Sequence, residues 1–221
     1  MKNMVEKFRC QLVSWKDIER WSKNIVKEVM KSGYEPEIVI GLARGGLVPA
    51  RLIADYLNIK DLYAVKTEHW GLTATPDGKA KLAQGLQISI DGKRVLVVDD
   101  ITDTGQSLKL AVDHIKGHNP SEIRSATLLH ITHSKYVPDY YSDEVPEDKW
   151  TWFIFPWNVY EDMRNLIPKT LYEPKDRYEI KNALKEQFQI DVRIRIISEV
   201  LRDLAKRGII KKNGNKWELV K

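Results

Sequence analysis

The sequence predicts an α/β fold: a mostly parallel sheet flanked by helices, followed by a small helical subdomain. Short apolar runs typical of buried strands alternate with segments whose apolar residues recur at helical spacing. From about residue 160 onward the pattern is helical instead. A length of 221 residues suits one α/β domain and a small appendage. We therefore expect a main domain over residues 1–160 and a C-terminal subdomain over residues 161–221.

The elements follow one another in βα order. Apolar positions at helical spacing, ending at Gly33, predict a first helix after Ser14, and a second is expected over residues 47–57. A third contains Leu108 and ends at Gly117. The polar stretch 67–85 is expected to be a long loop, and Asp91-Gly92 is a hairpin turn signal. Strands of the sheet are expected at 38–42, 62–66, 95–98, 126–131 and 152–155.

The C-terminal subdomain is expected to be a three-helix or winged-helix-like unit. Ile197, Val200, Leu201 and Leu204 lie on one helical face that ends at Gly208. The following segment "IIKKNGNKWELV" is expected to form a small hairpin.

Composition limits the partners and the setting. The net charge of +5 suits nucleic acid or a small polyanionic substrate, and we favour the small anion because the charge is spread. A single cysteine, Cys10, excludes an internal disulfide and suits a reducing compartment. The N-terminus lacks the apolar core of a signal peptide, and no apolar run approaches the ~20 residues of a membrane helix. We expect a cytoplasmic protein with no membrane partner.

The stretch "VLVVDDITDTGQSL" carries the chemistry. Asp99 and Asp100 follow an apolar strand, and ligands of such sheets bind beyond the carboxyl ends of the strands. The next residues lead into a helix N-terminus, whose backbone N–H groups favour an anion. Gly105 allows a phosphate close to the backbone, and Thr102, Thr104 and Ser107 offer hydroxyls. The acids suit sugar hydroxyls or a Mg²⁺ that bridges to further phosphates.

Other readings of the acid pair are less favoured. Response-regulator receivers lack a Thr-Asp-Thr-Gly loop directly after the acids. Phosphatases with an aspartyl nucleophile space their acids by one residue, whereas Asp99 and Asp100 are adjacent. A purely structural capping role is the third alternative.

Two further segments strengthen the ligand hypothesis. "GLARGGLVPAR" places Arg44 among Gly41, Gly45 and Gly46 in a strand-to-helix turn, which makes a second anion site. "WTWFIFPWN" is dense in aromatic residues. We expect Phe155 and Trp157 to pack in the core and Trp152 to stack on a base, with core packing as its alternative.

These motifs resemble those of type I phosphoribosyltransferases, over residues 38–158. The acid-pair stretch resembles their phosphoribosyl pyrophosphate motif, "GLARGGLVPAR" their pyrophosphate loop, and "WFIFPWN" the base-binding segment of enzymes acting on 6-oxopurines. The resemblance implies Mg²⁺, a homodimer, a cis peptide after Ala43, and ribose and metal contacts from Asp99 and Asp100. Asp103 would act near purine N7 as a general base, with Trp152 and Phe153 against the base. The implied phosphoribosyl pyrophosphate contacts are Ala43, Arg44, Gly45, Lys66, Asp99, Asp100, Thr102, Asp103, Thr104, Gly105, Gln106 and Ser107.

Lys66 and three loop residues near this site each have a functional and a non-functional interpretation. Lys66, at a strand end, is expected at the pyrophosphate, with a solvated lysine as the alternative. The resemblance places His69, Lys79 and Lys81 in a loop that closes over the site and excludes water; an ordinary surface loop is the alternative.

The base preference depends on Ile131. Enzymes for 6-oxopurines usually carry a lysine there, which donates to O6, whereas isoleucine offers O6 nothing. We therefore expect adenine as the base. A 6-oxopurine is the alternative, served by His130 or Lys135.

The C-terminal subdomain leaves a further alternative. Arg193, Arg195, Arg202, Lys206 and Arg207 crowd one helix, which would suit a DNA-binding regulator that senses phosphoribosyl pyrophosphate. We favour instead a cover or dimer contact near the base-binding segment, and expect nucleic acid to be an unlikely partner.

Overall fold

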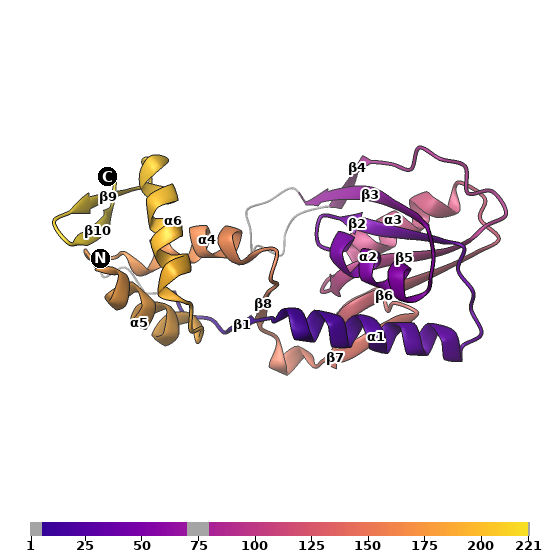
Figure 1. Ribbon diagram of the computed structural model, residues 1–221, viewed down its shortest axis with the longest axis horizontal. Coiled ribbons are helices and arrows are strands. Elements are labelled where there is room, and N and C mark those ends of the chain that lie inside the picture. Colours follow the sequence, from indigo (N-terminus) through magenta and orange to yellow (C-terminus); the bar gives the residue numbers. More distant parts are fainter. Residues whose placement is uncertain (1–5, 70–79, 221) are drawn as a thin grey trace. The chain divides into compact units, whose positions relative to one another are not determined.

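The computed structural model describes residues 6–69 and 80–220. The chain forms two compact units (Figure 1). The terminal unit comprises Met1–Trp15 and Thr151–Lys221, and the sheet unit comprises Lys16–Trp150. The expected division into a main domain (1–160) and a C-terminal subdomain (161–221) stays a prediction.

The sheet unit confirms the predicted α/β class. Within residues 16–69 and 80–150, six strands lie in the order β4-β3-β2-β5-β6-β7, and all neighbours are parallel except the antiparallel pair β3-β4. The strands are β2 (Ile38–Ala43), β3 (Asp61–His69), β4 (Ala80–Gln84), β5 (Arg94–Thr102), β6 (Glu122–Ile131) and β7 (Tyr140–Val145). The helices are α1 (Trp15–Lys31), α2 (Leu47–Tyr56) and α3 (Gln106–Lys116), with a 3₁₀ turn η1 (Glu147–Lys149).

Helices α2 and α3 cover opposite faces of the sheet. On one face Ile38, Ile40 and Leu42 share a core with the apolar side of α3. Gly41 points the other way, because a Cβ built there would lie 3.0 Å from the Cβ of Ala50 in α2. This two-sided cover explains the near-continuous apolar runs of β2 and β5.

The sheet departs from the sequence expectations at its edges. Part of the expected loop 67–85 is strand, because β3 continues to His69 and β4 follows at Ala80–Gln84. The turn at Asp91-Gly92 exists, with Gly92 at φ 68°, but it joins no hairpin, since β5 is parallel to both its neighbours. The polar edge strand β7 was not expected.

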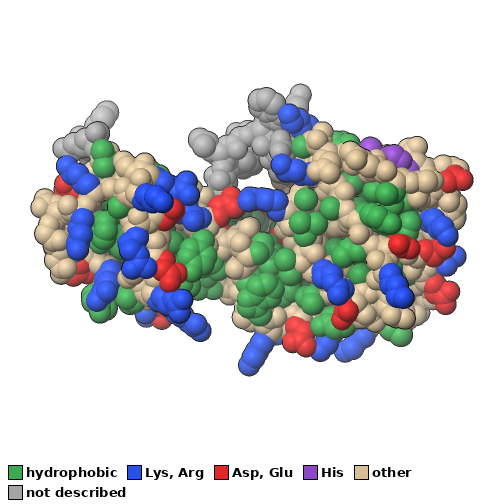
Figure 2. Space-filling model, turned by 45° about the horizontal axis from the view of Figure 1, so that its top comes forward, with side chains coloured by type: hydrophobic (Ala, Val, Ile, Leu, Met, Phe, Trp, Pro, Cys, Tyr) green, Lys and Arg blue, Asp and Glu red, His purple; other side chains and the backbone are tan. Residues whose placement is uncertain are grey.

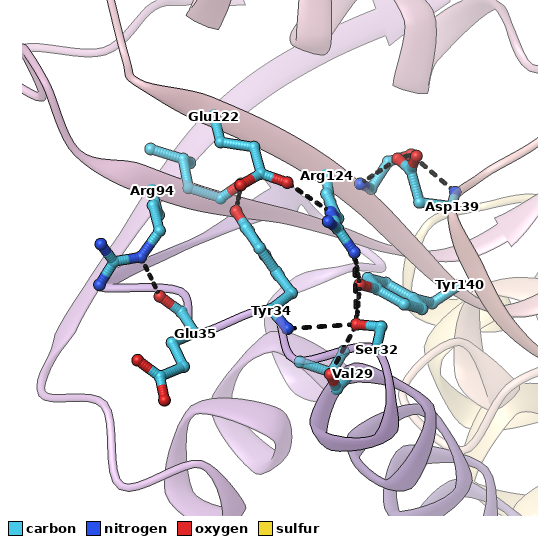
Figure 3. Close-up of polar contacts among 11 residues, drawn as sticks. Val29, Ser32, Tyr34, Glu35, Arg94, Glu122, Arg124, Asp139 and Tyr140 are labelled. Atoms are coloured by element: carbon cyan, nitrogen blue, oxygen red, sulfur yellow. Dashed lines mark hydrogen bonds and ion pairs between the residues drawn. The ribbon is translucent and has the colours of Figure 1, made fainter.

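A polar network fixes the loop after α1 to the sheet (Figure 3). The hydroxyl of Tyr34, itself buried, donates to the backbone oxygen of Val95 in β5 at 2.7 Å. Arg124 of β6 donates to the hydroxyl of Tyr140 at 2.5 Å and to that of Ser32 at 3.2 Å. The network thereby connects α1 to three neighbouring strands.

The terminal unit is mostly helical, as expected, and has its own core. Strand β1 (Cys10–Leu12) pairs in parallel with β8 (Trp152–Ile154), so the strand expected at 152–155 does not join the main sheet. That pairing brings together residues about 140 positions apart, which local sequence pattern does not reveal. The expected hairpin is present. The remaining elements are α4 (Val159–Thr170), α5 (Arg177–Phe188), α6 (Ile194–Lys206), β9 (Ile210–Asn213) and β10 (Lys216–Leu219).

Replacing Tyr34 with Phe tests the network. The variant should unfold at about 1 kcal/mol lower free energy, because the backbone oxygen of Val95 loses a buried donor. Urea unfolding measures this, with Tyr63→Phe as the control, since its hydroxyl lies 3.5 Å from Asp61 at the surface. Equal losses in the two variants would contradict the assignment.

Candidate active site

The two adjacent acids lie in the second half of β5. Pairing of β5 with β2 ends at Val98, whereas pairing with β6 continues through Asp99 to Thr102. We expected the acids at the end of the strand. The strand instead continues past them to Thr102. The backbone N–H of Asp100 donates to Oδ1 of Asp99 at 2.9 Å. Burial and the neighbouring carboxylate of Asp100 raise the pKa of Asp99 well above its usual range.

The glycine turn after β2 lies directly against these acids. A Cβ at Gly45 would be 2.0 Å from Oδ2 of Asp100, and one at Gly46 would be 2.4 Å from the backbone oxygen of Val98. A larger residue at Gly46 would separate turn and acids, because it would meet backbone, and one at Gly45 would displace the Asp100 carboxylate. The peptide between Ala43 and Arg44 is cis, as the resemblance implies. Lys66 of β3 is the register partner of Ala43, so the structure brings it to the same turn.

The loop from β5 to α3 lines a hollow of about 210 Å³. Gly105, at φ 77°, has no room for a side chain, because its Cβ would lie 2.6 Å from Oγ of Ser134. The lining residues are Asp99, Asp100, Ile101, Thr102, Asp103, Thr104, Gly105, Ser107 and Leu108. Gln106 is exposed at the start of α3. The predicted phosphate loop and the acids therefore share one hollow.

Thr102 differs from its expected role. Its side chain is buried, and its hydroxyl donates to the hydroxyl of Thr127 in β6 at 3.0 Å. That hydroxyl points into the sheet, which does not agree with the expectation that it meets a ligand. The side chain of Thr104 is half-buried, and its hydroxyl accepts from the N–H of Gln106 at 3.4 Å.

His133 is a neighbour of the site that sequence reasoning missed. Its Nε2 lies 2.7 Å from Oδ1 of Asp103, and both side chains are partly exposed. The residue follows β6, where a polar run after a buried strand was the available signal. An imidazole thus stands beside the predicted general base.

The expected base-binding residues are divided between the units. Ile131, the last residue of β6, is fully buried, and His130 is also buried. Trp152 and Phe153 are half-buried in β8 of the terminal unit. The indole N–H of Trp152 donates to Oδ1 of Asp162 at 2.9 Å, a contact the sequence did not indicate. Phe155 is buried and stacks on Trp157 at 5.0 Å, in agreement with core packing.

The expected lid residues are only partly described. His69 ends β3 and Lys81, which is exposed, lies in β4, whereas Lys79 is outside the described residues. Among the described residues, no cluster of three or more His, Cys, Asp or Glu side chains could hold a metal. No helix within this part of the chain is long and apolar enough to cross a membrane.

Comparison with known proteins identifies the family. The phosphoribosyl transferase domain family matches residues 11–164. The chain belongs to this family. It is a phosphoribosyltransferase of the purine type. Helices α5 and α6 and the β9-β10 hairpin follow the matched residues.

Several relatives of this phosphoribosyltransferase carry enzyme names. A xanthine-guanine phosphoribosyltransferase of Cereibacter sphaeroides is 32% identical over 152 residues, which cover 66% of this chain and 86% of the relative. A hypoxanthine-guanine phosphoribosyltransferase of Aquifex aeolicus is 28% identical, covering 67% and 87%. The solved purine phosphoribosyltransferase of Pyrococcus horikoshii has a TM-score of 0.58 at 27% identity, covering 67% and 93%.

Asp162→Asn tests the support of Trp152. Burial raises the pKa of Asp162 to about 6 from 3.8. The folded state therefore holds this proton more tightly, so the contribution of Asp162 to stability is largest below pH ~4 and is lost as pH rises to ~6. Asn keeps an acceptor for the indole without a charge. The variant should be more stable than wild type above pH ~6, by at most about 3 kcal/mol, and should match it near pH ~4.

Thermal unfolding between pH ~4 and ~8 measures the difference. Asp148→Asn, at an exposed position of η1, is the control. A pH-independent difference between Asp162→Asn and wild type would refute the assignment.

Proposed function

We propose that this phosphoribosyltransferase couples a free purine base to phosphoribosyl pyrophosphate, giving a purine nucleoside 5′-monophosphate and pyrophosphate. The observation that carries the proposal is that the acid pair lines one hollow together with the loop before α3 and lies directly against the glycine turn. A ligand with a phosphate at one end, hydroxyls in the middle and a pyrophosphate at the other fits these three parts.

Each part has a role in this proposal. The backbone N–H groups of the loop before α3, with Thr104 and Ser107, hold the 5′-phosphate at the helix N-terminus. Asp99 and Asp100 accept from the ribose hydroxyls. Arg44 and Lys66 hold the pyrophosphate from the turn and from β3. Their positions, side by side at the carboxyl ends of parallel strands, are those expected for a ligand site.

Mg²⁺ fits the acid pair. Two adjacent carboxylates are too few to enclose an ion, but Mg²⁺ commonly binds one or two carboxylates together with substrate phosphates. Asp99 and Asp100 would hold it, and when bound it would neutralise charge on the pyrophosphate leaving group. Burial and the neighbouring carboxylate of Asp100 both raise the pKa of Asp99, and a bound cation would offset the second of these effects.

The reaction then needs a base for the purine proton. N9 of the purine attacks C1 of the ribose, the bond from C1 to the pyrophosphate oxygen breaks, and the purine loses a proton. Asp103 accepts or shares the proton at N7, and Nε2 of His133 lies 2.7 Å from its Oδ1.

For the base we propose a 6-oxopurine. The names of the relatives from Cereibacter sphaeroides and Aquifex aeolicus support it, and they favour it over the adenine that Ile131 suggested. His133 supplies a physical reason. O6 and N7 are neighbours on the purine, so an imidazole beside Asp103 offers O6 a donor that the missing lysine does not.

Adenine remains the second candidate, and one observation favours it. The position of the family lysine holds Ile131, which is fully buried and apolar. Without that cation, the exocyclic amine of adenine meets no competing donor there. A homodimer and a cytoplasmic location also stay predictions.

Base specificity is measured with the wild-type enzyme and His133→Ala. We expect a higher kcat/KM for hypoxanthine, guanine or xanthine than for adenine. The variant should lose about 10- to 100-fold with the 6-oxopurines, because their O6 loses its donor. His118→Ala, on the loop after α3, is the matched control. Better use of adenine by the wild type would decide for the second candidate.

Asp103→Asn tests the general base. Turnover should fall by about 10²- to 10⁴-fold, because an amide does not accept the proton. Binding of phosphoribosyl pyrophosphate, measured by calorimetry, should remain. Asp113→Asn, on the exposed side of α3, controls for the loss of one negative charge. Near-normal turnover of Asp103→Asn would remove Asp103 from the mechanism.

A further inference from the structure

The terminal unit contains a winged-helix arrangement after the residues that match the family. Helix α4 is followed by a short extended stretch in which Lys175 bridges Trp217 of β10 in antiparallel fashion. Helices α5 and α6 come next, separated by five residues that begin with Gln189 at φ 59°. The antiparallel pair β9-β10 closes the unit (Figure 1). Winged-helix modules have this order of elements: a helix, a strand, two helices and a two-stranded wing. The second of the two consecutive helices contacts the ligand.

Helix α6 has two chemically distinct faces. Ile197, Val200 and Leu201 are buried, and Leu204 completes this apolar face. At three- and four-residue intervals on the opposite side come polar residues, all exposed or half-exposed. They are Arg195, Ser198, Arg202 and Lys206. The helix is therefore anchored by one side and offers a basic side outward.

A groove lies between α6 and the wing. Its volume is about 440 Å³. Ser198 and Arg202 come from α6, Lys212 and Asn215 from the hairpin, and Arg177 from the start of α5. Within the described part of the chain, Arg202 and Lys212 form no ion pair, although Lys212 lies over the ring of Trp217. These cations are thus available to an anionic ligand.

Acidic residues near the groove are already engaged. Glu199 binds Arg195 at 2.8 Å, and Asp203 binds Arg207 at 2.9 Å. Asp176 caps α5, where its Oδ1 accepts from the N–H of Tyr178 at 2.7 Å. Glu199 and Asp203 are thus each matched by a cation, and Arg202 and Lys212 remain as unpaired cations of the groove in the described part of the chain.

The net positive charge of the chain comes from its C-terminal segment, residues 176–221. Residues 176–221 hold twelve Lys and Arg against seven Asp and Glu, a surplus of five, which equals the net charge of all 221 residues. Residues 1–175 are consequently balanced in charge. Figure 2 shows Lys and Arg side chains distributed over the terminal unit.

We propose that the basic side of α6 and the wing bind duplex DNA, with α6 in the major groove and the wing on the adjacent backbone. A polyanion is favoured because the surplus charge lies on both walls of the groove. Duplex DNA is favoured over duplex RNA because its major groove, about 12 Å wide, admits a helix, whereas that of RNA is too narrow. This inference does not rest on the proposed enzymatic function, and it reverses our expectation that nucleic acid is an unlikely partner.

The test uses the full chain and fluorescently labelled duplex DNA of about 20 base pairs in random sequence, long enough for a module of this size. Wild type should bind, with affinity that falls steeply as salt rises. Arg202→Glu/Lys212→Glu should weaken binding by more than about tenfold at ~100 mM salt and reduce the salt slope by about 2. Lys60→Glu/Lys116→Glu, an equal charge change at exposed positions of the sheet unit, should bind like wild type.

Each outcome decides the matter. Absence of binding by the wild type at ~50 mM salt, equal losses in both double variants, or tighter binding of duplex RNA or single strands would overturn the proposal. Thermal unfolding and transferase turnover are measured on every variant. Loss of DNA binding with both unchanged supports the proposal, and loss accompanied by unfolding is resolved with the milder Arg202→Gln/Lys212→Gln, which must also weaken binding.

Discussion

The close approach of the glycine turn to the acid pair is the constraint on which the site depends. Turn and acids belong to neighbouring parallel strands, β2 and β5, and their backbones come together where strand pairing ends at Val98. Gly46 lies so near that a Cβ would be 2.4 Å from the backbone oxygen of Val98. Only a backbone without side chains brings a cationic turn this close to two carboxylates. The hollow before α3 then extends the same surface.

This arrangement concentrates negative charge where anionic substrate must bind. Burial and the neighbouring carboxylate of Asp100 raise the pKa of Asp99, and the two carboxylates would also repel a pyrophosphate. Cationic side chains on the neighbouring strands offset this repulsion. Arg44 follows the cis peptide, and Lys66 is in register with Ala43, so both lie at the carboxyl ends of the strands on that side of β5. In the proposed reaction, a divalent cation held between the acids and the substrate would complete the balance.

Local pattern predicted the centre of the sheet well and its periphery poorly, for physical reasons. Buried parallel strands such as β5 are apolar runs, and the motif at Asp99 and Gly105 is local in sequence, so both were recognisable. Strand β7 is polar because it lies at an edge. The pairing of β1 with β8 joins segments far apart in sequence. The contact between Asp103 and His133 depends on the path of the chain after β6, which local pattern does not indicate. The direction of the Thr102 hydroxyl is likewise set by its neighbour Thr127, not by its own surroundings in sequence.

The charge distribution separates two tasks in one chain. A small polyanionic substrate is held by a few cations placed within hydrogen-bonding distance, and it needs no net charge on the surrounding domain. Residues 1–175 agree with this, since their basic and acidic residues are equal in number. A polymer of phosphates instead responds to surplus charge spread over a surface. The surplus of residues 176–221 lies outside the residues that line the hollow at the acid pair, and its position on α6 and the wing is the basis of the proposed binding of duplex DNA.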